Sequence, residues 1–119
     1  MKPAALSLSA LVALAHLWFL VLEAVLWKTP FGRRVFRMTP EQAEATSVLA
    51  ANQGLYNGFL AAGIVWGLVL GLPDGRAVLT FFLACVIVAG VFGAATVNRR
   101  ILFLQALPAA LALVCVRLA

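Results

Sequence analysis

Apolar runs of 18 residues or more occupy most of the chain, and no other feature constrains its fold as strongly. A run of that length with few charges is long enough to cross a bilayer as a helix. The runs are rich in Leu, Ala and Val without period-2 alternation, which favours helices over the strands of a membrane barrel. The sequence therefore predicts an all-α membrane protein, a single domain over residues 1–119 in which four transmembrane helices form an antiparallel bundle. The expected helices cover approximately residues 3–27, 40–71, 76–97 and 101–118.

Composition excludes the soluble classes of protein. The 119 residues are 65% hydrophobic and 11% charged, whereas a soluble domain is about half apolar and a quarter charged. The net charge of +5 comes from residues between the apolar runs, so it indicates membrane orientation rather than nucleic-acid binding. Cys85 and Cys115 lie inside apolar runs without CxxC spacing, and one His with one Glu lacks a third metal ligand. We expect neither a disulfide framework nor a metal site.

The basic residues are divided unequally between the two sides that four spans create. Six lie in the connections at 28–39 and 98–100, and three lie near the termini or in the middle connection. Cytoplasmic loops carry the excess of Lys and Arg. We therefore expect a multi-pass protein of the bacterial inner (cytoplasmic) membrane, with these two connections in the cytoplasm and both termini outside.

The second expected helix has the clearest start signal. Thr39 is a suitable N-cap, Pro40 suits the first helical position, and Gln42 completes a capping box. In the connection before it, aromatic and aliphatic residues alternate with arginines over residues 31–37. This pattern is suited to lying on an anionic membrane leaflet.

Small residues recur every four positions on the second helix. One stripe is Ala50, Gly54, Gly58 and Ala62, and a second is Gly63, Gly67 and Gly71. Because lipid provides no hydrophobic driving force between helices, small residues mark close helix contacts. Tight packing within a monomer and an oligomer interface both explain the stripes. The number of glycines in so small a chain favours a homo-oligomer, a dimer or trimer.

Most polar residues inside the expected spans lie toward the cytoplasmic side, which predicts a polar pocket that opens inward. Polar residues in a span are costly and by default suggest function. The pocket would bind a small amphipathic or anionic ligand, drawn by the surrounding arginines. Its expected residues are His16, Glu23, Asn52, Gln53, Tyr56, Asn57 and Gln105, with Arg33, Arg37 and Arg99 at the rim. In an enzyme, Glu23 or His16 would act as acid or base, Tyr56 would donate a hydrogen bond and Asn52 would orient the ligand.

Residues 51–58 read Ala-Asn-Gln-Gly-Leu-Tyr-Asn-Gly, a specific run. With this run, and over essentially its full length, the chain resembles a family of small integral membrane proteins of bacteria and fungi classed as a domain of unknown function. The resemblance implies four helices and no established activity.

Two looser resemblances imply other activities. The four-helix architecture is similar to the membrane-associated eicosanoid and glutathione metabolism superfamily, which implies a trimer, glutathione as cofactor, and roles for Asn52 and Tyr56 in its pocket. That superfamily has arginines within the pocket on its second helix, whereas this helix has none. The lone Glu23 of the first helix is similar to that of small multidrug exporters, which implies proton-coupled export. A third hypothesis is a structural or regulatory partner subunit, and whether the protein is an enzyme stays open.

Overall fold

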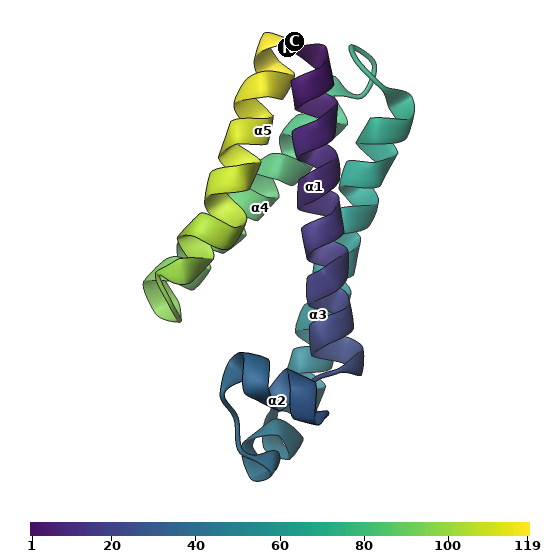
Figure 1. Cartoon of the computed structure of the whole chain (residues 1–119). Coiled ribbons are helices and arrows are strands. Elements are labelled where there is room, and N and C mark those ends of the chain that lie inside the picture. Colours follow the sequence, from purple (N-terminus) through teal and green to yellow (C-terminus); the bar gives the residue numbers. More distant parts are fainter. The chain divides into compact units, whose positions relative to one another are not determined.

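The computed structural model describes residues 1–119 and contains helices and connecting turns without a β-strand. The all-α class is thus confirmed. The elements, drawn in Figure 1, are α1 (Lys2–Leu20), the π-helical turn η1 (Val21–Val25), α2 (Pro30–Phe36), α3 (Pro40–Leu70), α4 (Arg76–Thr96), the π-helical turn η2 (Leu102–Ala106) and α5 (Leu107–Leu118).

Three helices are long and apolar enough to cross a membrane. They are Lys2–Val25 with 24 residues, Pro40–Leu70 with 31 and Arg76–Thr96 with 21, and the apolar helix Leu102–Leu118 is shorter. These bounds lie within two residues of the expected ones. The short helix α2, by contrast, lies in a connection for which the apolar pattern predicts no helix.

Local hydrogen bonds explain where α3 begins. The Thr39 amide donates to Gln42 Oε1 at 2.9 Å, and the Gln42 amide donates to Thr39 Oγ1 at 3.1 Å. This reciprocal pair is a capping box, and it satisfies two backbone donors at the start of the helix. Pro40 occupies the first helical position, where its missing N–H costs nothing. The predicted capping box is confirmed.

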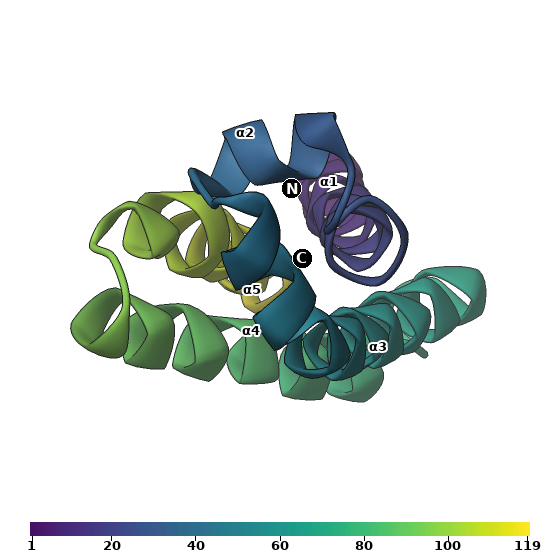
Figure 2. The same ribbon diagram turned by 90° about the horizontal axis from the view of Figure 1, so that it is seen from below.

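The chain divides into two compact units. Unit 1 comprises residues 1–14 and 60–119, and unit 2 comprises residues 15–59. Unit 1 contains a hydrophobic core to which α1, α3, α4, α5 and the α3–α4 turn all contribute. Figure 2 shows α4 alongside α5. The core residues are Ala5, Val12, Ala13, Ile64, Leu72, Leu79, Leu83, Val86, Ala109, Ala112 and Val116.

Glycines let the helices of unit 1 approach closely. A Cβ at Gly67 would lie 2.6 Å from the Leu79 side chain, and a Cβ at Gly90 would lie 2.7 Å from the Ala106 amide nitrogen. Gly71 differs, because it ends α3 with a φ of +73° and no atom approaches the position of its missing Cβ. Gly71 therefore terminates the helix and does not continue the packing stripe that the sequence suggested.

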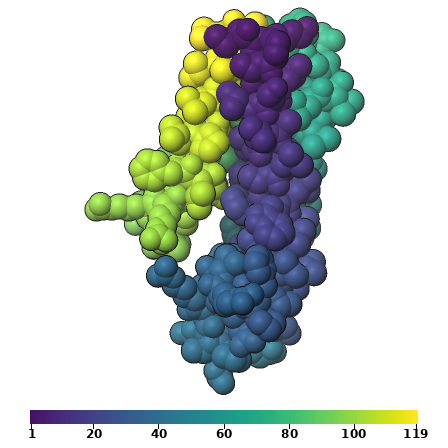
Figure 3. Space-filling view, viewed as in Figure 1, coloured from purple at the N-terminus to yellow at the C-terminus, as the bar shows by residue number.

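The α3–α4 turn and the C-terminus meet at one end of unit 1. The Arg76 guanidinium donates to the carbonyl of Val116 at 3.3 Å and to that of Ala119. The first turn of α1 lies beside the last turn of α5 at this end, as the purple and yellow atoms at the top of Figure 3 show. Arg76 thereby satisfies carbonyls that a helix C-terminus leaves without partners.

Unit 2 joins the end of the first helix, α2 and the first turns of α3. The Trp27 ring packs against the Phe36 ring of α2 with centroids 4.7 Å apart and planes inclined by 42°, and its indole Nε1 donates to Thr46 Oγ1 of α3 at 3.0 Å. Lys28 and Glu44 form a salt bridge of 3.4 Å. The aromatic contact and the polar bonds together hold the three elements of this unit in place.

Candidate functional site

The first helix widens into a π-helical turn around Glu23. The Leu26 amide donates to the Val21 carbonyl at 2.9 Å, one residue further back than in an α-helix. Such single π turns are often found at functional sites. Glu23 lies in the middle of η1, half buried, on a helix otherwise long and apolar enough to cross a membrane.

The partner of Glu23 is Asn57 of α3. The Asn57 side-chain nitrogen donates to Glu23 Oε1, and Asn57 is only 5% exposed. Gly54 makes this approach possible, since a Cβ there would lie 3.2 Å from Glu23 Cβ, from the Ala24 amide nitrogen and from the Leu20 carbonyl oxygen. The Glu23–Asn57 pair is therefore an interhelical polar contact that depends on a glycine one turn before the asparagine.

His16 is almost completely buried in unit 2, at 1% exposure. Its ring meets the Phe19 ring edge-on, with centroids 5.2 Å apart and planes at 71°. His16 therefore lies in a packed interior. The side chain that donates a hydrogen bond to Glu23 is that of Asn57.

The other three polar residues predicted on α3 face outward. Asn52, Gln53 and Tyr56 are exposed, Tyr56 by 57%. The Asn52 side chain donates to the Val48 carbonyl of its own helix at 3.0 Å, and the Tyr56 ring lies beside Phe59. At about 100° per residue, Asn52 and Tyr56 point well away from Asn57. Of the predicted pocket residues on this helix, Asn57 is the one that forms a hydrogen bond with Glu23.

The remaining predicted residues are distributed over both units. Arg33 of α2 is partly buried in unit 2, and Arg37 follows α2 with a left-handed φ of 53°. Gln105, partly buried within η2, and the exposed Arg99 belong to unit 1. Sequence reasoning missed Trp27 and Thr46, which bind each other in unit 2. A tryptophan at the end of an apolar run was the available signal, because such residues mark membrane interfaces.

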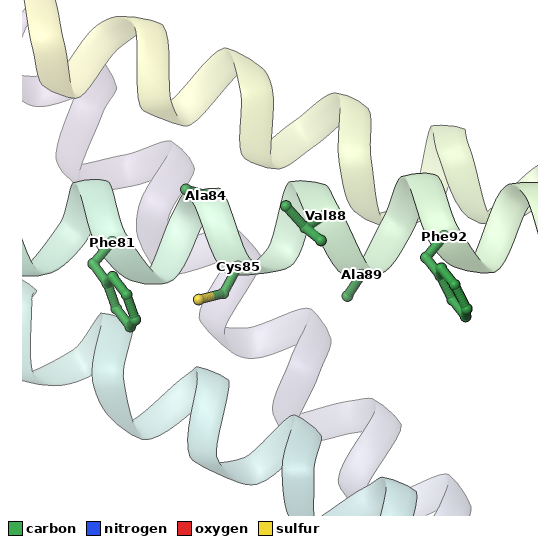
Figure 4. Close-up of a pocket in the computed structure, with 6 residues that line it drawn as sticks. All are labelled: Phe81, Ala84, Cys85, Val88, Ala89 and Phe92. Atoms are coloured by element: carbon green, nitrogen blue, oxygen red, sulfur yellow. The ribbon is translucent and has the colours of Figure 1, made fainter.

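Two surface grooves lie on unit 1, and no predicted site residue lines either. The larger, about 470 Å³, follows one face of α4 and is shown in Figure 4. Its lining is entirely apolar apart from a thiol: Phe81, Ala84, Cys85, Val88, Ala89 and Phe92. The second, about 310 Å³, is lined by apolar residues of α4, η2 and α5. No three His, Cys, Asp or Glu side chains come together to hold a metal ion.

Comparison with known proteins gives two matches over most of the chain. A family described as "Protein of unknown function (DUF1304)" matches residues 10–117. The uncharacterized protein YpaA of Lactococcus lactis subsp. lactis (strain IL1403) is 32% identical over 109 residues, which is 90% of this chain and 91% of YpaA. No solved structure matches.

Proposed function

We propose, for a chain that belongs to the DUF1304 family of proteins of unknown function, a role as a small integral membrane protein that binds the polar end of a small amphipathic ligand at Glu23 and Asn57. The single observation that carries this proposal is the hydrogen bond from Asn57 to Glu23 at a π turn of an apolar helix. An ionisable side chain in such a helix is costly to maintain, and function is the usual reason for it.

The chemistry of the pair favours one class of ligand. Glu23 Oε2 and the Asn57 side-chain oxygen are acceptors that the interhelical hydrogen bond leaves available. A ligand with an N–H, O–H or cationic end would satisfy these acceptors, whereas an anionic end would be repelled by a charged carboxylate. The amphipathic class is therefore supported better than the anionic one.

Polar side chains on the outer face of α3 support the presence of a bound molecule or a second copy of the chain. Gln53 and Tyr56 are exposed on a helix long and apolar enough to span a membrane. Polar groups facing lipid have no partners, so a bound molecule or a second copy of the chain would be expected to cover them. We propose a homo-oligomer, a dimer or trimer, for this reason.

We also propose four membrane crossings in a four-helix bundle, with both termini outside the inner membrane. The hydrogen bonds of Arg76 to the last carbonyls support this arrangement, because the α3–α4 turn and the C-terminus then lie at one end of unit 1. Leu102–Leu118 is about 25 Å long at 1.5 Å per residue. That length is a few ångströms short of the hydrocarbon core, a mismatch that bilayers accommodate at modest cost.

Native mass spectrometry of the protein released gently from its own membranes tests the binding site. We expect the wild type to retain a small-molecule adduct that Glu23→Gln loses, because the amide cannot replace the carboxylate as a double acceptor. Glu44→Gln, which neutralises an exposed carboxylate of unit 2, is the matched control and should retain it. An adduct that persists in Glu23→Gln, or no adduct in the wild type, contradicts the proposal.

Proton-coupled export is the second candidate function, and the lone carboxylate within a span favours it. In that case Glu23 exchanges a proton for a cationic substrate. Glu23→Gln should abolish transport of a fluorescent organic cation into inverted vesicles, and Glu23→Asp should shift its pH dependence. Transport that is unchanged in Glu23→Gln rules export out.

A glutathione-dependent transferase or isomerase has weaker support. It requires Asn52 to face an anionic ligand, but Asn52 donates its side-chain amide to its own helix. Tyr56, the candidate hydroxyl donor, likewise points away from the Glu23–Asn57 pair.

A further inference from the structure

Unit 2 holds a short basic helix against the end of the first apolar helix. The Gly32 face of α2 lies against the Leu26 and Trp27 carbonyls, so closely that a Cβ at Gly32 would overlap them. The Phe36 ring packs against the Trp27 ring, and the ring centroids of Phe31 and Trp18 lie 6.2 Å apart. Since the apolar span ends at Val25, these contacts keep α2 within about one helical turn of the hydrocarbon boundary.

The charges of this segment are largely uncompensated. Lys28 is paired with Glu44, but Arg33, Arg34 and Arg37 have no salt bridge. These three residues are called the arginine segment below. Arg33 Nε is moreover a buried donor without a hydrogen-bond acceptor in the protein, and leaving a buried donor without an acceptor is unfavourable. An acceptor from outside the chain would remove that cost.

The apolar residues of α2 indicate which class of molecule supplies that acceptor. Phe31, Val35 and Phe36 are 43%, 46% and 39% exposed beside the arginines. Aromatic and aliphatic side chains next to arginines favour the boundary between headgroups and acyl chains, where the apolar side chains contact the acyl chains and the arginines contact the headgroups. The planar guanidinium groups match phosphate oxygens in pairs.

We propose that the arginine segment binds the phosphate of an anionic phospholipid headgroup, with Arg33 Nε donating to it and Arg34 and Arg37 supplying further charge. The exposed apolar residues of α2 pack on the acyl chains of the same leaflet. This site is separate from the Glu23–Asn57 pair and requires only that the first helix spans the membrane. A negative result in the Glu23 experiment therefore does not contradict the proposed lipid site.

The full protein is first reconstituted in nanodiscs of phosphatidylcholine with about one fifth phosphatidylglycerol, a proportion that gives an anionic surface. It is then gently released from the nanodiscs and titrated with phosphatidylglycerol, and native mass spectrometry measures its apparent affinity for this lipid. We expect the triple variant Arg33→Gln, Arg34→Gln and Arg37→Gln to weaken it about a hundredfold, from about 1 kcal/mol per basic residue. Affinity for phosphatidylcholine should not change.

The matched control removes the same amount of charge at three exposed arginines elsewhere in the chain. Arg99→Gln with Arg100→Gln and Arg117→Gln should retain phosphatidylglycerol nearly as the wild type does. Equal losses in the two triple variants would show a general charge effect and overturn the proposal. Displacement of the lipid by millimolar inorganic phosphate would overturn it as well, because it would reveal a site for a small soluble anion.

A milder variant covers the case in which the first triple variant does not fold. Arg34→Gln with Arg37→Gln changes only exposed side chains, so packing is retained. A several-fold loss of phosphatidylglycerol affinity supports the site, and an unchanged affinity overturns it.

Discussion

At the scale of single residues, one hydrogen bond joins polar side chains of the first apolar helix and α3. Glu23 and Asn57 bind each other, whereas Asn52 uses its amide within its own helix. The i, i+4 spacing of the sequence places these side chains on helix faces, but only helix packing decides which face meets a neighbour. For that reason the sequence predicted the polar residues and not their pairing.

A comparison of two asparagines measures the value of this contact. Asn57→Ala should lower the free energy of unfolding by about 0.6 to 2 kcal/mol, the range of interhelical hydrogen bonds in membranes. Asn52→Ala should change it by less than about 0.5 kcal/mol, because an exposed residue loses little. Unfolding in mixed micelles with increasing dodecyl sulfate gives both values. Equal effects would mean that the contact with Glu23 adds no stability.

At the scale of helices, glycine determines how closely neighbours pack. Gly54, Gly67 and Gly90 each face another helix of the same chain. Gly54 and Gly67, one from each stripe that suggests an oligomer in the sequence, thus face neighbours within one molecule, whereas Ala62 is exposed and Gly71 has no close neighbour. The proposal of an oligomer now depends mainly on the exposed polar face of α3. Helix α2 and the two π turns are shorter than the window in which periodicity is visible. The start of α2 nevertheless had a local signal that the apolar pattern does not capture, because Thr29 caps the helix by accepting from the Gly32 amide and Pro30 occupies its first position.

Two adjacent positions on α4 test the packing role of glycine. Gly90→Val should lower the free energy of unfolding by about 1 to 3 kcal/mol, since its Cβ would overlap the Ala106 backbone. Ala89→Val adds its methyl groups on the exposed side of the same turn and should stay within about 0.5 kcal/mol. The same micelle titration applies. A tolerated valine at position 90 would show that α4 and η2 pack less closely than described.

At the scale of the whole molecule, the family and three helices long and apolar enough to cross a membrane were predictable from the sequence. Long apolar runs are a strong signal for helices that can cross a membrane, and the family resemblance seen in the sequence is confirmed by the match over residues 10–117. The number of membrane crossings does not follow from the apolar runs alone, because the helix Leu102–Leu118 is shorter than the other three apolar helices.

Single cysteines count the crossings. In a background with Cys85→Ala and Cys115→Ala, a membrane-impermeant maleimide should label Asp74→Cys and Ala119→Cys from the same side and Asn98→Cys from the other. The bonds from Arg76 to the C-terminal carbonyls are the reason for the first expectation. Labelling of positions 98 and 119 from one side would mean that the last helix does not cross.

The π turn at Val21–Val25 carries one residue more than an α-helical turn would need. In geometric terms it is an insertion that the first helix has absorbed. Loss of one residue there would restore regular winding and leave the residues beyond it at nearly the same angle around the helix axis, because the wide turn accommodates the extra residue. Trp27 would still face Thr46, and the helix itself would stay whole. The position of Glu23 is therefore also the place where the helix can change its length by one residue without breaking.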